Sequence, residues 1–238
     1  MGQMLNRRRG MGNQRMIEIE YLESRDPDIN TSPYIETNYL ANANTVVQLK
    51  IYIPSEYQYN IGNRRRFIFG GRRNWSNSNC FAFNYRGSSP SYFGYNIGVK
   101  TGDSLCSADY DTIYNIEVSS TNININGTDY AISSSNVSDN TYTQDVFGLN
   151  NANNHYSEYK ILGRIYFIKF LELGEVKLDL IPVRVGTTGY MYDKVSRKLF
   201  ANQGTNDFIL GPDKIEGGGS KSLIINILCG YSVERRAA

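Results

Sequence analysis

Apolar and polar residues alternate along many short segments of this chain, and turn residues separate these segments. In the clearest case, Thr45–Ile53, every second residue is apolar, beginning with Val47 and ending with Ile53. An alternation with a period of two residues is typical of a strand that buries one face and exposes the other. The pattern therefore predicts an all-β protein whose sheets each have a buried face.

The segment 161–213 contains the densest succession of such strands. Ile161–Phe170 and Val176–Val185 predict two long strands joined by a turn at Gly174, and no helical periodicity interrupts them. Pro182 lacks an N–H donor, so the second strand is expected to lie at an edge or to end its regular pairing there. A short hairpin is predicted across residues 194–197.

Asn126-Gly127 separates two further alternating runs, and this dipeptide is a strong hairpin signal because both turn positions need a positive φ. The remaining predicted strands have the same alternating or β-branched and aromatic composition. They are Ile17–Leu22, Phe67–Gly70, Cys80–Tyr85, Tyr92–Val99, Ile113–Ser119 and Asp145–Leu149.

Several motifs resemble those of one known family. Residues 163–169 read G-R-I-Y-x-x-K, residues 179–184 read D-L-I-P-V-R, and residues 189–212 read G-Y-M-Y-D-K-V-S-x-K-L-F-x-N-x-G-T-x-x-F-x-x-G-P. Together with E-Y-L-E-S at 20–24, Y-I-E-T at 34–37 and F-G-G-R at 69–72, they resemble the concanavalin A-like (LamG-like) jelly-roll domains, which are common in phage and prophage structural and tail proteins. The resemblance implies an antiparallel β-sandwich of jelly-roll type.

Composition divides the chain into four parts. Residues 1–16 form a basic arm, 17–213 the jelly-roll domain, 214–220 a glycine-rich linker and 221–238 a separate tail. Arg7, Arg8 and Arg9 lie in the arm, which has no apolar period and should be disordered by itself. The alternatives for the arm are a solvated tail and a segment that becomes ordered against a partner.

The tail carries an apolar run that would be an aggregation hazard if it remained free. Its candidate contact residues are Leu223, Ile224, Ile225, Ile227 and Leu228. They are expected either to pack back on the domain or to add a strand to the sheet edge of a partner.

Charge and cysteine content exclude several classes of protein. The net charge is only +2, which is weaker than a sequence-independent nucleic-acid binder normally shows. Cys80, Cys106 and Cys229 form neither a disulfide framework nor a zinc pattern. The apolar run 223–229 is too short to span a membrane. The first sixteen residues are basic and polar without an apolar run, so we expect no signal peptide. No cofactor is expected, because the sequence lacks a phosphate loop, a dinucleotide fingerprint and a nucleophile elbow.

A candidate carbohydrate site combines aromatic rings with cations between residues 57 and 75. Its members are Trp75, Tyr57, Tyr59, Arg72 and Arg73. A ring can stack on a sugar while charged side chains bind an anionic group. The alternatives are solvated loops or a surface that faces an acidic patch of a capsid, and for Trp75 a ring that caps the core. Metal ligation is weakly indicated, since Asp103 and Asp207 are ordinary turn formers outside any ligand series.

The candidate for catalysis is the run E-I-E-Y-L-E at 18–23, which resembles the E-x-D-x-x-E strand of jelly-roll glycoside hydrolases. Glycosidases need two carboxyl groups at a controlled separation. The middle Asp of that motif is Glu20 here, and the run lies on the first strand rather than a central one. The protein is therefore expected not to be an enzyme.

The resemblance implies a structural component of a phage virion, such as a head fibre, tail fibre or decoration protein. We expect its termini to contact other virion proteins and its domain to present a lectin-like face to glycans of the host surface. Proteins of this kind are commonly homotrimers. The alternatives are a jelly-roll glycoside hydrolase or depolymerase, and a purely structural capsid component without a ligand.

Overall fold

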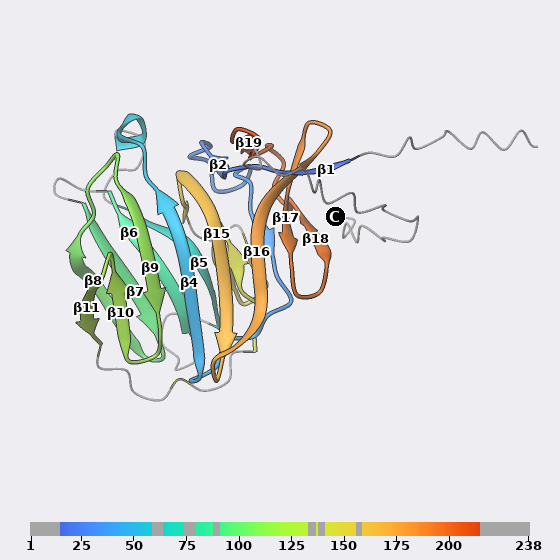
Figure 1. Cartoon of the computed structure of the whole chain (residues 1–238). Helices are drawn as coiled ribbons and strands as arrows, with labels where there is room; N and C mark the ends of the chain where they lie inside the picture. Colours follow the sequence, from blue (N-terminus) through green and yellow to red (C-terminus); the bar gives the residue numbers. More distant parts are fainter. Residues whose placement is uncertain are drawn as a thin grey trace, which may run out of the picture.

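The computed structural model describes residues 15–58, 64–73, 80–87, 91–132, 137, 141–155 and 159–214. These residues form two packed β-sheets, shown one behind the other in Figure 1. The predictions for Arg7, Arg8 and Arg9, for Tyr59 and Trp75, and for the tail residues Leu223, Ile224, Ile225, Ile227 and Leu228 lie outside the described residues. The same holds for residues 215–220 of the predicted linker.

The larger sheet has the strand order β11-β10-β9-β4-β15-β16-β17-β18, and β1, β2 and β19 pair at its upper end in Figure 1. Its strands are β1 (Met16–Glu18), β2 (Leu22–Ser24), β4 (Thr45–Tyr52), β9 (Ile113–Val118), β10 (Asn122–Ile125), β11 (Thr128–Ala131), β15 (Gly163–Glu172), β16 (Glu175–Val185), β17 (Thr188–Asp193), β18 (Lys198–Ala201) and β19 (Ile209–Leu210).

The smaller sheet has the order β3-β12-β5-β6-β7-β8, with β13 and β14 also paired to β5. Its strands are β3 (Ile35–Glu36), β5 (Arg65–Arg72), β6 (Cys80–Arg86), β7 (Tyr92–Ile97), β8 (Lys100–Ser107), β12 (Asp145–Val146), β13 (Asn150–Asn151) and β14 (Tyr159–Lys160). A 3-10 turn, η1 (Ser55–Tyr57), follows β4.

The chain crosses repeatedly between the sheets, for example from β4 to β5, from β8 to β9 and from β14 to β15. The described strand pairs are antiparallel except those of β13 and β14, which run parallel to β5. The prediction of an all-β sandwich of jelly-roll type is confirmed.

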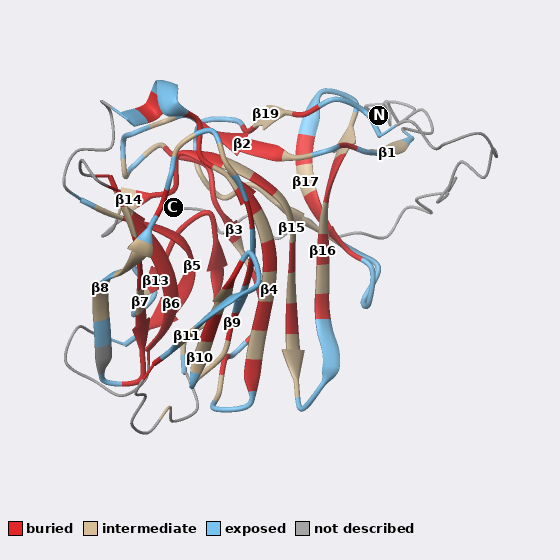
Figure 2. Ribbon diagram, turned by 60° about the vertical axis from the view of Figure 1, so that its left-hand side comes forward, coloured by how far each residue is buried: buried red, intermediate tan, exposed pale blue. Residues whose placement is uncertain are grey.

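The core lies between the sheets and is rich in aromatic rings. Figure 2 shows buried residues alternating with less buried ones along β4, and an almost continuous run of buried residues along β5 and β6. Phe69 of the smaller sheet meets Phe170 of the larger sheet edge-on at 6.1 Å, and Phe93 meets Tyr114 at 4.9 Å. Such edge-to-face contacts are favourable beyond the area that they bury. The predicted alternation in β4 is confirmed, since Val47, Leu49 and Ile51 are buried while the intervening residues are partly exposed.

The turn chemistry explains two further predictions. Asn126 and Gly127 have φ values of 51° and 87°, as the predicted hairpin between β10 and β11 requires. The pairing of β16 with β15 ends at Leu180, before Pro182. On the same side of β16, the pairing with β1 begins at Val183, after Pro182. The missing N–H of proline is tolerated there because the strand changes partner at this point.

Two strand predictions need correction. The predicted strand Ile17–Leu22 is divided into β1 and β2, because the chain leaves β16 near Ile19 and joins β15 at Leu22. Strand β8 was not predicted, since its sequence KTGDSLCS lacks apolar alternation. It lies at the edge of the smaller sheet and pairs with β7 alone, so its backbone can form the strand without apolar side chains on alternate positions. Within the described ranges, no helix has the length and apolar character needed to cross a membrane.

Candidate functional site

The larger sheet presents to solvent a face that carries amide, aromatic and charged side chains; we call it the outer face. It is the side of β9, β4, β15 and β16 that points away from the core. Its central residues are Gln48, Lys50, Tyr52, Asn115, Glu117, Arg164, Tyr166, Phe167, Lys169 and Asp179. They occupy the polar half of the alternation whose apolar half fills the sandwich.

A β-bulge places two aromatic residues side by side on the outer face. In the pairing of β15 with β4, Ile165 lies opposite Ile51 and Phe167 lies opposite Lys50, so Tyr166 is an additional residue. Ile165 and Ile168 are fully buried, whereas Tyr166 and Phe167 between them are both partly exposed. Bulges often redirect side chains next to functional sites, and this one gives the face two neighbouring rings.

Two open depressions of about 740 and 730 Å³ lie on the outer face. The charged depression is lined by Glu18, Glu20, Lys50, Tyr166, Lys169, Asp179, Ile181, Lys194 and Lys214. The amide depression is lined by Gln48, Leu49, Asn115, Ile116, Glu117, Asn124, Asn126 and Gly127. Both also include Ile113 and Phe167, so the depressions adjoin at these two apolar side chains.

Ion pairs occupy most of the charges in the charged depression. Asp179 lies 3.1 Å from the Nζ of Lys194 and 3.8 Å from that of Lys169. Lys214 lies 2.5 Å from Glu18 at the edge of the sheet. Lys50 differs from these lysines, because its Nζ lies 5.0 Å from the centre of the Tyr166 ring. A cation held over an aromatic face is favourable and has a restricted position.

Side-chain hydrogen bonds connect the polar groups of the amide depression. The Nε2 of Gln48 donates to Glu117 at 2.8 Å, and the amides of Asn122 and Asn124 both donate to Asp129 at 2.8 Å. The bonds from Asn124 and Asn122 lower the pKa of the Asp129 carboxyl. These contacts restrict the amides of Gln48 and Asn124 before any ligand binds, which lowers the entropic cost of binding a polar ligand.

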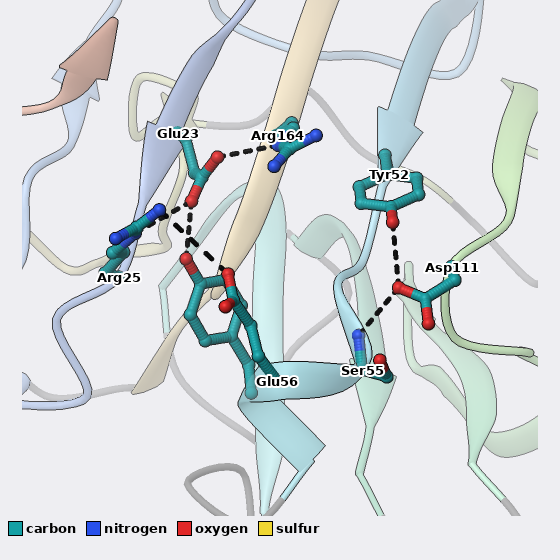
Figure 3. A network of polar contacts seen from close by, with 8 residues as sticks. Glu23, Arg25, Tyr52, Ser55, Glu56, Asp111 and Arg164 are labelled. Carbon is teal, nitrogen blue, oxygen red and sulfur yellow. Dashed lines mark hydrogen bonds and ion pairs between the residues drawn. The ribbon is translucent and has the colours of Figure 1, made fainter. Parts of the chain in front are cut away.

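A buried carboxylate, Glu23, contacts Arg164 of β15, and Figure 3 shows its contacts with Arg25 and Arg164. Glu23 has an exposed fraction of 1% and accepts hydrogen bonds from Tyr57, Arg25 and Arg164 at 2.5, 3.0 and 2.6 Å. Burial alone would raise the pKa of Glu23, but the three hydrogen bonds outweigh it and lower that pKa. Glu23 is therefore an ionised structural group and not a proton donor.

Arg164 joins this buried network to the outer face. Its guanidinium carbon lies 4.5 Å from the ring centre of Tyr21 and 4.9 Å from that of Tyr52. The hydroxyl of Tyr52 in turn donates to Asp111 at 2.8 Å, as Figure 3 also shows. The ring positions at this end of the face therefore depend on the Glu23–Arg164 pair.

The structure does not support two members of the predicted carbohydrate site. Tyr57 has an exposed fraction of 5% and donates to Glu23, and Arg72 is fully buried with its Nε bonded to Asn151 at 3.2 Å. Side chains enclosed in this way cannot form a surface for a sugar, so the prediction is wrong for Tyr57 and Arg72. Arg73 is exposed, and its role as a glycan contact stays a prediction.

The predicted acidic run lies beside the charged depression. Glu18 and Glu20 are exposed lining residues, whereas Glu23 is buried in its own network. Asp103, a weak candidate for metal ligation, is bonded to Arg65 at 2.6 Å. Among the described residues, no group of three or more His, Cys, Asp or Glu could hold a metal ion.

A second buried acid lies in the smaller sheet, remote from the outer face in the fold. Asp145 of β12 is fully buried, and its Oδ2 lies 2.7 Å from the Nδ1 of His155. Burial raises the pKa of Asp145 to about 6, although its bond to His155 acts in the opposite direction. Burial would lower the pKa of His155, but the bond and charge of Asp145 raise it.

This pair predicts a pH dependence of stability that Asp145→Asn should reduce. Because the folded pKa of Asp145 exceeds the ordinary value of 3.8, its contribution to stability decreases as the pH rises from about 4 to 6. The raised pKa of His155 acts in the same direction, since its contribution is complete below pH 6.5 and is lost as the pH rises through the folded value. The unfolding free energy of the wild type should therefore fall between pH 4 and 8 by roughly 1–3 kcal/mol more than that of Asp145→Asn, measured by urea unfolding at a series of pH values. Parallel curves for the two proteins would contradict this assignment.

Comparisons with known proteins add little to this geometry. No family model matches the chain, and the search of curated proteins gives no match. Among solved structures, the chain is similar to the native heptameric SAP-like pentraxin from Limulus polyphemus. The identity is 10% and the TM-score 0.46, over 68% of this chain and 77% of that chain. A similarity this remote assigns neither a family nor a ligand.

The sequence contained a signal for the outer face that the prediction of the site did not use. Gln48 and Lys50 are polar members of the alternating run Thr45–Ile53, and Asn115 and Glu117 are polar members of Ile113–Ser119. The alternation places all four on the outward side of their strands, but it does not indicate that the two strands are neighbours and form one surface. The bulge at Tyr166 has no sequence signal that separates it from regular alternation. Without it, Tyr166 and Phe167 would point to opposite sides of β15.

Proposed function

We propose that this protein is a non-enzymatic carbohydrate-binding component of a phage virion, and that the outer face binds a glycan. The observation that supports glycan binding is the arrangement around Phe167. Its ring lies where the two depressions adjoin. Among the described residues, this ring packs against no other aromatic ring and lies under no lysine or arginine cation. An apolar ring can cover the C–H side of a sugar while Gln48 and Asn115 bind hydroxyl groups.

The virion role rests on the resemblance of the motifs at 163–169, 179–184 and 189–212 to jelly-roll domains of phage structural proteins. In this proposal the terminal segments attach the domain to capsid or tail proteins, and the outer face stays available to the host surface. Assembly as a homotrimer belongs to the same proposal. Labelling of purified particles with an antibody against the domain tests the location, and particles without label would contradict it.

Binding should depend on the amide of Asn115, whose side chain is exposed and forms no hydrogen bond within the described ranges. The full chain is tested on an array of bacterial surface polysaccharides, and the affinity for each bound polysaccharide is then measured with Asn115→Ala. Loss of one hydrogen bond should weaken binding about 2- to 10-fold.

Trp75→Ala provides the comparison with the loop predicted from the sequence. If Trp75→Ala abolishes binding and Asn115→Ala leaves it unchanged, the loop and not the outer face is the site. Assay of the same polysaccharides for new reducing ends separates binding from hydrolysis. Release of reducing ends that Glu20→Gln abolishes would establish a glycoside hydrolase instead.

A further inference from the structure

The outer face has room for more than one sugar unit. Its two depressions have nearly equal volumes, and each is within the range of about 300–1,000 Å³ that small ligands occupy. They adjoin at Phe167 and Ile113, so one continuous ligand can lie across both. The chemistry of the two halves differs, because four lysines and three carboxylates line one, and carboxamides with a single carboxylate line the other.

Lys50 is the cation of the charged depression that remains available to a ligand. The depression contains four lysines, and three of them form ion pairs with Asp179 or Glu18. Lys50 forms no ion pair within the described part of the chain. Its cross-strand neighbours, Phe167 and Asn115, are uncharged. A carboxylate that reached Lys50 would therefore not displace an existing partner.

The position of Lys50 is already restricted before any ligand arrives. Its Nζ lies over the ring of Tyr166, and that ring packs edge-on against Tyr21 at 5.5 Å. A side chain held in this way loses less conformational entropy when it forms an ion pair. Glu20 lines the same depression and has no ion-pair partner among the residues that the structure describes, so Glu20→Gln is included among the variants to be tested.

The amide depression disfavours a second anionic group. Glu117 lines this depression and accepts from the neutral amide of Gln48. Asp129, which is not a lining residue, accepts from the lining residue Asn124 and from Asn122. Neither carboxylate has an ion-pair partner among the described residues. An anionic sugar would be repelled here, whereas a neutral sugar can exchange hydrogen bonds with the carboxamides. The two halves therefore select different units and fix the direction of the ligand.

We infer that the outer face binds an acidic oligosaccharide. A carboxylate-bearing sugar lies in the charged depression against Lys50, and a neutral sugar lies in the amide depression beyond Phe167. This inference rests on the proposed glycan-binding function and specifies its ligand class.

The inference is tested with an array on which each bacterial polysaccharide is present both in its native form and after chemical reduction of its carboxylates to alcohols. The full chain should bind forms that contain uronic acids, and reduction of the carboxylates should weaken binding about tenfold or more, the usual effect of losing a hydrogen bond to a charged group. Lys50→Gln should remove this preference. Lys198→Gln is the matched control, because Lys198 is exposed on β18, outside both depressions.

The outcomes separate this inference from the function on which it rests. Equal binding of native and reduced forms, with binding still weakened by Asn115→Ala, would overturn the acidic ligand and retain glycan binding. A preference for acidic forms that persists in Lys50→Gln would also overturn the inference. Stronger binding of amino-sugar polysaccharides that Glu20→Gln abolishes would assign a cationic ligand instead. Failure of every polysaccharide to bind in either form would overturn the proposed function and this inference together.

Discussion

Replacement of Glu23 by alanine is expected to lower the free energy of unfolding by about 3–5 kcal/mol, the usual effect of removing one partner from a buried charged network. The carboxylate has an exposed fraction of 1% and accepts hydrogen bonds from Tyr57, Arg25 and Arg164. Without it, the Tyr57 hydroxyl and part of the Arg164 guanidinium lose their acceptor in a buried environment. Urea unfolding followed by circular dichroism measures the difference.

Glu56→Ala provides a matched control for this prediction. Glu56 is exposed and lies 4.0 Å from Arg25 at the edge of the same network. An exposed ion pair of this kind is worth at most about 1 kcal/mol, so this variant should unfold nearly as the wild type does. A change below 1 kcal/mol in Glu23→Ala would show that the network is not a stabilising element.

The pH dependence of Glu23→Ala gives a second readout. Because the hydrogen bonds lower the pKa of Glu23 in the folded state, its stabilisation is complete above the ordinary pKa of 4.5 and is lost as the pH falls through the folded value. The wild type and Glu23→Ala should therefore differ most at neutral pH, and the difference should shrink as the pH falls below 4.5 and through the folded pKa of Glu23. A constant difference across the acid range would contradict the ionised state assigned to Glu23.

Phe167→Ala is expected to weaken glycan binding about 30-fold while the fold is retained. Central aromatic anchors of binding surfaces typically contribute about 2 kcal/mol or more, which corresponds to this factor in Kd. Phe167 occupies the central position here, because it lines both depressions of the outer face. The affinity is measured by isothermal titration with the polysaccharide that the array selects.

Two variants distinguish the loss of a binding ring from a general loss of structure. Phe167→Leu keeps an apolar side chain on the bulge but removes the flat ring, so it should fold normally and still bind weakly. Tyr92→Ala removes a partly exposed aromatic residue from β7 of the smaller sheet, and it should leave the affinity unchanged. Wild-type affinity in Phe167→Ala would exclude this ring as a platform for a sugar.

The fold could be predicted where one face of a strand is buried, because burial imposes alternation on the sequence. The alternating residues of β4 and β9 and the Asn-Gly turn after β10 indicated their positions correctly. Strand β8 carries no such pattern, since an edge strand can pair through its backbone with polar side chains on it.

The site was harder to predict because its contacts join residues that lie far apart in the sequence. Polar character suggested that Tyr57 and Arg72 are exposed, but their partners Glu23 and Asn151 lie 34 and 79 residues away. The outer face is likewise assembled from β4, β9, β15 and β16, and its two neighbouring rings depend on one additional residue in β15. Local sequence patterns contain neither kind of information.

The most direct test of the central claim is hydrogen–deuterium exchange of the full chain with and without the polysaccharide that it binds. Binding to the outer face should slow exchange in peptides from β4, β9 and β15, including the bulge at Tyr166 and Phe167. Slowed exchange confined to the peptides between residues 57 and 86, with these three strands unchanged, would contradict the account.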